Sequence, residues 1–274
     1  MQSAVGHFVP WEGGCLLVSE GAGIVPMHAH YAIQIAFCSE PGIRFRTSDD
    51  ADWTEYGGAM IPSRQPHSMN IREGLRYNAV MFVEPETLEG RALTELYLRD
   101  GIASMPQTVL TTAAPALFAA WREERSKRAI TDAAQGLVHA LTQGVEPMRL
   151  SDERIMRAVA FIKRNLDSRL TLEDVAAEAY LSPSRFRHLF VEQTGMALRP
   201  YILWRRFLRV WELLMAGESL SSAAHAAGFA DAAHLTRTSR SMFGLTPSTI
   251  RLDGPLLPGD DSGGSRGGGG AGAR

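Results

Sequence analysis

The 274-residue sequence predicts an α+β fold, in which an N-terminal β-barrel with flanking helices precedes an all-α C-terminal domain. Three observations support this prediction. Short β-type runs separated by Gly, Pro, Asn and Asp fill residues 14–84. From residue 86 onward, apolar residues recur three and four positions apart, as in amphipathic helices. The segment 144–151, which contains Gly, Pro and polar residues, then marks a boundary between two domains.

The N-terminal domain, residues 1–145, begins with five expected strands. They are the runs CLLVS, YAIQIAF, IRFRT, GGAMIP and YNAVMFV. Short strands at regular spacing, with turn residues between them, are typical of a barrel or a sandwich. Three amphipathic helices follow, TLEGRALTELYLRDG, APALFAAWREERSKR and ITDAAQGLVHALTQG. We expect these helices to cover the β unit or to pair between subunits.

The C-terminal domain, residues 151–253, is predicted to be helical from Asp152 to Arg251. It carries 14 Lys and Arg against 11 Asp and Glu, whereas the whole chain has a formal net charge of −2. A surface that meets phosphates is therefore expected in this half. The Gly-rich residues 255–274 cannot bury enough apolar area to order themselves, so we expect a disordered tail.

The cysteine and hydropathy patterns indicate a reduced, cytoplasmic protein. Cys15 and Cys38 are the only cysteines, and we expect both to be small buried hydrophobes, with a redox pair as the alternative. No stretch approaches 18 consecutive apolar residues, so no contact with a membrane is expected. The first residues also lack the charged start and apolar core of a secretory leader.

An internal repeat lies in the C-terminal domain. The stretch SPSRFRHLFVEQTG begins at Ser182, and DAAHLTRTSRSMFG begins at Asp231, 49 positions later. Each stretch starts with a residue that can cap a helix N-terminus, and each ends with a Gly that can adopt the left-handed cap conformation, Gly195 or Gly244. A short helix, TLEDVAAEA or LSSAAHAAG, precedes each one. This order predicts two helix-turn-helix units.

The second helix of a helix-turn-helix unit enters the DNA major groove by its N-terminal end. We therefore expect the exposed side chains at that end to contact DNA. They are Ser184, Arg185, Arg187 and His188 in the first unit, and His234, Thr236, Arg237 and Arg240 in the second. Arg suits this role because its guanidinium can bond guanine O6 and N7 together. One such Arg could be an ordinary solvated residue, but two capped units at one offset favour DNA binding.

A single long helix is predicted between the two units, from Pro200 to Gly217. At 1.5 Å per residue it is roughly 26 Å long. That length could place the two recognition helices in successive major grooves of a duplex, about 34 Å apart. The helix is unusually apolar, and we expect core packing as the reason, with a partner contact as the alternative. Its large apolar residues are Leu203, Trp204, Phe207 and Trp211.

These residues resemble the C-terminal domain of the AraC/XylS family of bacterial transcription regulators. The resemblance runs from LTLEDVAAEAYLSPSRFRHLFVEQTG to AAGFADAAHLTRTSRSMFGLTPSTIR. Family pattern positions are occupied by Tyr201, Arg206, Gly228, Phe229, Arg237, Phe243, Gly244, Pro247 and Arg251. The resemblance implies promoter binding and regulation of transcription, usually with an N-terminal effector or dimerisation domain.

The second unit departs from the family pattern. Ala223 stands where a large aliphatic residue is favoured, and Ser239 stands where Phe is favoured. Ala232 and Ala233 occupy recognition positions that are often polar. We therefore expect the second unit to be less well packed and to read fewer bases than the first.

The N-terminal domain contains the stretch PMHAHYAIQ, which places His28 and His30 two positions apart, where one strand would aim both rings the same way. This part of the chain resembles the cupin barrel. The first cupin motif falls near Gly23, His28, His30 and Gln34, and the second near Gly57, Pro62, His67 and Asn70. In metal-binding cupins the ligands are two His, one Glu and a further His, and Gln34 here stands at the Glu position.

Three readings of the histidines stay open. His28, His30 and His67 could bind Zn, Fe, Mn or Ni, with the Gln34 carbonyl oxygen filling a further position. Alternatively, these four residues could line a metal-free pocket for an organic effector. A purely structural role is the third reading.

The predicted function is a sequence-specific regulator of transcription whose promoter binding is controlled by a small-molecule or metal effector. Its expected partners are double-stranded promoter DNA, a second copy of the chain in a homodimer and, if it activates, RNA polymerase. The alternative is a metal-dependent cupin enzyme, a dioxygenase or isomerase with a helical appendage. The enzyme is disfavoured because Gln34 replaces the usual carboxylate and the repeat would be unexplained. We therefore predict no enzymatic activity.

Overall fold

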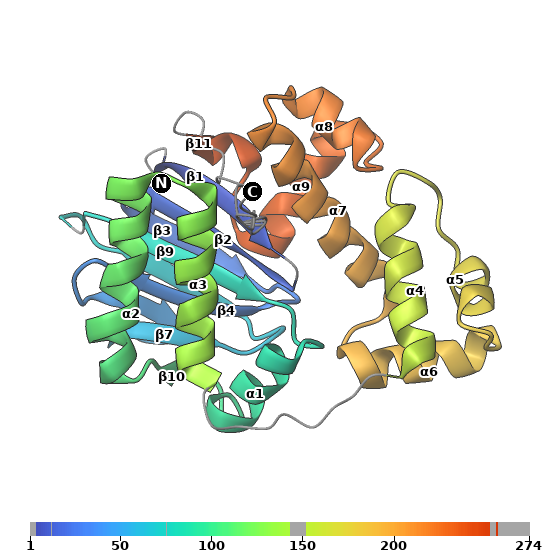
Figure 1. Ribbon diagram of the computed structural model, residues 1–274, viewed down its shortest axis with the longest axis horizontal. Coiled ribbons are helices and arrows are strands. Elements are labelled where there is room, and N and C mark those ends of the chain that lie inside the picture. Colours follow the sequence, from blue (N-terminus) through green and yellow to red (C-terminus); the bar gives the residue numbers. More distant parts are fainter. Residues whose placement is uncertain (1–3, 12, 75, 143–151, 253–255, 257–274) are drawn as a thin grey trace, which may run out of the picture.

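The computed structural model describes residues 4–11, 13–74, 76–142, 152–252 and 256. A β domain with helices on one face adjoins a helical domain (Figure 1). The α+β fold predicted from the sequence is confirmed. The predicted boundary at 144–151 falls outside the described residues, as does the predicted tail apart from Leu256. No helix in the described part of the chain is long and apolar enough to cross a bilayer.

Two sheets form the β domain. The larger sheet has the strand order β10-β7-β4-β9-β2-β1-β11, and the smaller has the order β3-β8-β5-β6. Neighbouring strands are antiparallel except for β1 and β11, which are parallel. The strands are β1 (Ala4–Trp11), β2 (Gly14–Glu20), β3 (Gly23–His28), β4 (Ile33–Cys38), β5 (Ile43–Arg46), β6 (Thr54–Tyr56), β7 (Gly58–Ile61), β8 (His67–Ile71), β9 (Asn78–Val83), β10 (Ala103–Ser104) and β11 (Ile250–Leu252).

The larger sheet is buried on both faces, and its side chains divide between two cores. On β4, Ile33, Ile35 and Phe37 belong to the core beneath the flanking helices. Their neighbour Ala36 points to the opposite face, into a core shared with Phe45 of the smaller sheet. The space between the two sheets is therefore the barrel interior.

Three helices and a π-helical segment follow the barrel strands. They are α1 (Leu88–Tyr97), α2 (Gln107–Ala119), the π-helical Ala120–Glu124 and α3 (Lys127–Thr142). Helices α2 and α3 cover the outer face of the larger sheet (Figure 1). Of the two roles expected for these helices, covering the β unit is the one observed within the chain. The helix predicted over 114–128 was wrong in its bounds, because the left-handed Arg125 (φ 51°) separates α2 and its π-helical extension from α3.

The C-terminal domain contains six α-helices within the described residues. They are α4 (Glu153–Arg164), α5 (Leu172–Glu178), α6 (Pro183–Thr194), α7 (Leu198–Met215), α8 (Leu220–Ala226) and α9 (Ala232–Phe243), followed by a 3₁₀ turn at Pro247–Thr249. Both repeats form the predicted helix-turn-helix units, α5–α6 and α8–α9. The connecting helix α7 begins two residues before the predicted Pro200.

The predicted caps of the recognition helices are confirmed. The Ser182 side chain accepts a hydrogen bond from the Arg185 backbone N–H at 3.4 Å, and the Asp231 side chain accepts one from His234 at 2.6 Å. At the other ends, Gly195 (φ 72°) and Gly244 (φ 66°) adopt the left-handed conformation. These caps fix where each recognition helix starts and stops.

Three parts of the strand prediction were wrong. Strands β1, β3, β6, β8 and β10 were not among the five predicted runs. The prediction of helix through to Arg251 also fails at its end, because Ile250–Leu252 forms β11 and pairs with β1. Finally, β3 ends at His28, so His30 lies beyond the strand and not on it.

The two domains share one hydrophobic core through α7. Trp204 is fully buried, with its ring 6.1 Å from Tyr31 and 5.8 Å from Phe82 of the barrel domain. Trp211 stacks on Phe8 of β1 at 5.4 Å. The apolar character of this helix is thus explained by core packing, as expected, and much of that core is the barrel itself.

Candidate functional site

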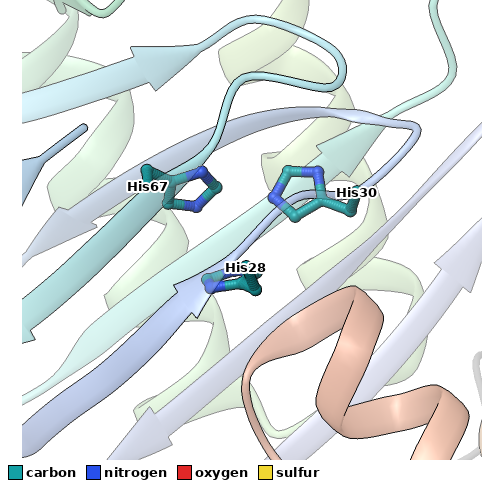
Figure 2. A group of neighbouring side chains, drawn as sticks. All are labelled: His28, His30 and His67. Atoms are coloured by element: carbon teal, nitrogen blue, oxygen red, sulfur yellow. The ribbon is translucent and has the colours of Figure 1, made fainter. Parts of the chain in front are cut away.

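Three histidines from separate places in the sequence converge inside the barrel (Figure 2). His28 ends β3, His67 begins the neighbouring β8, and the two residues are register partners. His30 joins them from the loop between β3 and β4. All three are buried, and one ring nitrogen from each lies within 4.8 Å of the others.

The hydrogen bonds of these rings define which nitrogens are available. Each Nδ1 lies against a backbone carbonyl: His28 with Pro26 at 2.8 Å, His30 with Ala32 at 2.8 Å, and His67 with Gln65 at 2.9 Å. A neutral ring that donates its Nδ1–H to a carbonyl keeps Nε2 as a lone-pair acceptor. Backbone carbonyls commonly orient metal-binding histidines in this way.

Gln34 reaches the same cluster from β4. Its Oε1 lies 2.8 Å from His30 Nε2, and its Nε2 lies 3.7 Å from the Met69 sulfur. Because both Oε1 and that ring nitrogen are acceptors, the contact is favourable only if the amide turns its NH₂ group inward or a cation serves both atoms. Two ligands of one octahedral ion with bonds of about 2.1 Å lie about 3 Å apart, which suits the second arrangement.

The three histidines could hold a transition-metal ion if the rings moved closer together. His67 Nε2 is buried with no hydrogen-bond partner, which is a reason to expect a ligand there. Two nitrogens bound to one tetrahedral zinc ion, with bonds of about 2.1 Å, lie about 3.4 Å apart. Since the nitrogens lie within 4.8 Å of one another, the most distant pair must approach by about 1 Å to share one ion.

Burial shifts the protonation of this cluster strongly. Desolvation, with neighbouring rings adding to it, lowers the pKa of His30 to about 3 and that of His67 to about 2. Desolvation also lowers the pKa of His28. All three rings are therefore neutral at neutral pH, the state required for a metal ligand or a hydrogen-bond acceptor.

We expect the chelator-treated protein to lose stability as the pH falls below about 6.5, the usual histidine value. Below that pH His30 and His67 are protonated in the unfolded chain but stay neutral in the folded protein, so protonation favours unfolding. Glu86 acts in the opposite direction, because burial raises its pKa to about 7. Its contribution to the free energy of unfolding is lost as the pH rises from 4.5 toward 7. His30 and His67 together against the one carboxyl leave a net slope of at least about 1.4 kcal/mol per pH unit, and His28, whose pKa is also lowered, adds to it. Urea midpoints across pH 4.5–7 measure it, and His67→Gln should flatten the slope. An unchanged slope would contradict the assignment.

A cavity of about 70 Å³ adjoins the histidines and lies between the barrel and the helical domain. Its lining is mostly apolar. From the barrel come Phe8, Cys15, Leu17, Val25, His28, Gln34, Met69, Val80 and Phe82. From the helical domain come Phe207, Leu208, Trp211, Ser239, Phe243, Leu245 and Thr246. A mostly apolar cavity is thus built by both domains together, and at its present volume it is smaller than a typical ligand pocket.

The residues expected to contact DNA differ in exposure between the two units. Ser184, Arg185, Arg187 and His188 are all exposed along α6. In the second unit Arg237 and Arg240 are exposed. His234 is half-buried against Phe229, with ring centroids 5.4 Å apart. Thr236 is half-buried, and its hydroxyl donates to the Ala232 carbonyl at 2.8 Å. The first unit therefore offers more free side chains at the start of its recognition helix.

Sequence reasoning missed the helical-domain side of the cavity and a cluster of charges between the domains. Ser239, which stands where the AraC/XylS pattern favours Phe, lines the cavity and donates to the Leu245 carbonyl at 2.6 Å. The small side chain at this position leaves space in the cavity. In the second cluster, buried Glu84 forms an ion pair with Arg205 of α7. Two carboxylates next to an apolar run, FVEPE, were the available signal for it.

Comparisons with known proteins place the C-terminal domain. A helix-turn-helix domain model matches residues 175–253. Regulatory protein PocR of Salmonella typhimurium is 30% identical over 118 residues, which is 43% of this chain and 38% of PocR. The TetD protein of transposon Tn10 from Escherichia coli is 33% identical over 98 residues, which is 35% of this chain and 71% of TetD. The chain belongs to the AraC/XylS family.

The fold of the two domains together is similar to that of a solved structure. The crystal structure of ToxT from Vibrio cholerae O395 aligns with a TM-score of 0.56 at 13% identity, covering 87% of this chain and 96% of ToxT. This likeness concerns the fold alone. ToxT bound to an unsaturated fatty acid aligns with a TM-score of 0.53 at 11% identity, over 90% of this chain and 91% of ToxT. The sequence matches to PocR span less than half of either chain, so the family membership is carried by the helical domain.

Proposed function

We propose that this protein is a sequence-specific DNA-binding regulator of transcription, in which residues 151–253 bind promoter DNA and residues 1–145 sense an effector. The observation that carries the proposal is the pair of capped recognition helices, α6 and α9. Each begins with an N-terminal turn whose donors and positive dipole end favour phosphates. Exposed arginines follow in both helices.

The sensing part of the proposal rests on the cavity, which His28 lines, and on the cluster that His28 forms with His30 and His67. Both domains line the cavity, so a molecule bound there has different contacts whenever the domains move apart. Such differential contact is what allows a ligand to shift an equilibrium between two arrangements. The fatty acid bound to a protein of similar fold, ToxT, supports an organic effector for this chain.

A metal effector is the second candidate, supported by the buried, partnerless His67 Nε2 and by the Oε1 of Gln34 facing an acceptor. His28, His30 and His67 would hold Zn, Fe, Mn or Ni, with Gln34 as a further ligand. An ion there would join two strands of the smaller sheet to the loop before β4. Among the described residues, no carboxylate belongs to this ligand group.

The test is DNA binding by the full-length protein on its own upstream DNA, with elemental analysis and with chelator present or absent. We expect specific binding that weakens steeply with salt. The metal effector would be supported by a stoichiometric metal whose removal changes the DNA affinity. In the double variant His28→Ala/His30→Ala, chelator should then cause no such change. Specific binding in metal-free protein would support the organic effector. Binding that ignores both DNA sequence and salt would contradict the proposed function.

A metal-dependent enzyme is the rival proposal, and two observations disfavour it. The cluster lacks an acidic ligand among the described residues, and the similar sequences PocR and NphR are a regulatory protein and a transcriptional activator. Homodimer formation and contact with RNA polymerase stay predictions. Sedimentation of the purified protein across a range of concentrations would test the first of them.

A further inference from the structure

The end of recognition helix α9 closes the cavity. Phe243, the last residue of α9, lies in an aromatic cluster with centroid distances of 3.9 Å to Phe207, 5.7 Å to Trp204 and 5.6 Å to Phe82. Its ring also stacks toward His30 at 6.2 Å. Phe243 therefore fills the space between the histidines, the barrel wall and α7.

The next residue, Gly244, touches the strand that carries His28. A Cβ at this position would lie 2.8 Å from the Pro26 carbonyl oxygen and 2.9 Å from Val25 Cγ1. Such distances are too short for a side chain to fit without movement, so the helix end is held directly against β3. Closure of the cavity thus depends on a glycine as well as on a phenyl ring.

The first unit is attached to the barrel domain differently. Arg91 of α1 donates to the Gln193 carbonyl at 2.8 Å, and Arg64 donates to the Gly195 carbonyl at 2.5 Å. Both carbonyls lie at the C-terminal end of α6, where cations are favoured by the helix dipole. A Cβ at Gly195 would meet nothing within 4 Å. The end of α6 is therefore held by polar contacts away from the cavity, and of the two recognition helices it is α9 that lines the cavity.

We propose that Phe243 is an internal occupant of the effector site, and that an effector binds by displacing it and so frees the second helix-turn-helix unit while the first stays attached. This inference rests on the proposed function and assigns the ligand class of its site. The cavity left beside Phe243 measures about 70 Å³, less than half of the roughly 150 Å³ known to hold benzene. A ligand of that size or larger needs a lining side chain to move, and the Phe243 ring lies between the two domains at this place.

The cavity wall defines the chemistry of the effector. Most of the lining is apolar, which selects a ligand with an apolar, ring-sized body. In the metal-free protein His28 gives its Nδ1–H to Pro26, so its other nitrogen can only accept a hydrogen bond. The geometry therefore favours an apolar molecule with a single donor group, for which indole is a suitable probe.

Closure by α9 is tested with a matched pair of variants, Gly244→Ala and Gly195→Ala. Both place a methyl group on a left-handed helix cap, at φ 66° and φ 72°, and so carry the same backbone penalty. Only Gly244→Ala also collides with β3. We expect amide hydrogen exchange in α8 and α9 to rise by about tenfold or more in Gly244→Ala but not in Gly195→Ala. Equal exchange in both variants would overturn the closure.

Competition is tested with indole and chelator-treated protein. If Phe243 occupies the site, the apparent affinity is reduced by the fraction of molecules that are open. We expect Phe243→Ala to bind indole about tenfold or more tightly than the native chain, and Phe243→Leu to fall between them. Met242→Ala, a neighbouring change on α9, should leave the affinity unchanged. Equal affinity in all variants, or no binding in any, would overturn the proposal. Neither test involves DNA, so failure here is separate from failure of the DNA-binding function.

Discussion

Replacing Arg205 with Ala is expected to lower the free energy of unfolding by about 3–5 kcal/mol. The Arg205 guanidinium is paired with Glu84, whose side chain is only 3% exposed. Trp204 Nε1 also reaches Glu84 Oε1, at 3.5 Å. Removing the arginine leaves a carboxylate buried between the two domains without its cation, and an unpaired buried charge is strongly destabilising. Urea denaturation of the full chain measures the change.

The same helix provides a control. Arg209, one turn further along α7, pairs with Glu212 at 2.9 Å, but both side chains are exposed, at 48% and 40%. Arg209→Ala should therefore cost less than about 1 kcal/mol. Combining Arg205→Met with Glu84→Gln should restore much of the stability, since both buried charges are then removed. Equal losses for Arg205→Ala and Arg209→Ala would show that burial of the Glu84 pair contributes nothing.

The second large effect is expected for Arg187→Ala. Arg187 is exposed on the first unit's recognition helix, whose start carries the most free side chains. Loss of a base contact should weaken specific binding by about 1–3 kcal/mol and relax the preference at one base pair. Affinity on the selected site and on single-base variants, at fixed salt, measures both changes.

The control for charge alone is Arg199→Ala, because Arg199 is exposed in the same domain but lies at the start of α7. We expect little effect on base preference from this change. A uniform loss of affinity on every sequence for Arg187→Ala would mean that Arg187 contacts only phosphate. No loss on any sequence would remove it from the interface.

The sequence predicted the helical domain more completely than the barrel, for a physical reason. Caps and turn residues are local signals, so Ser182, Asp231, Gly195 and Gly244 could be assigned their roles directly. The strand that ends at His28, GIVPMH, is short and its burial does not alternate regularly, and its Pro26 argues against a strand by itself. Its pairing with β8, which no local pattern specifies, forms the strand.

The candidate site shows the same division. The resemblance to the two cupin motifs implied that His28, His30 and His67 lie together, and the structure places them in one cluster. The contacts of Phe243 and Gly244 with the barrel were not predictable from the sequence, because both residues are also explained by packing and capping within α9. Contacts between domains have no periodic signature in the chain.

The parallel pairing of β11 with β1 has a consequence for the speed and ease of switching. Because the chain leaves the barrel after α3 and returns to it as β11, the second unit is tethered at both of its ends, by α7 and by the last strand. A tethered element rebinds at a local concentration in the millimolar range for short connections. Its contact with the cavity can therefore be weak and still stay closed most of the time. A ligand of modest affinity is then enough to shift the equilibrium toward the open arrangement. When the ligand leaves, the second unit returns to the cavity within the same molecule.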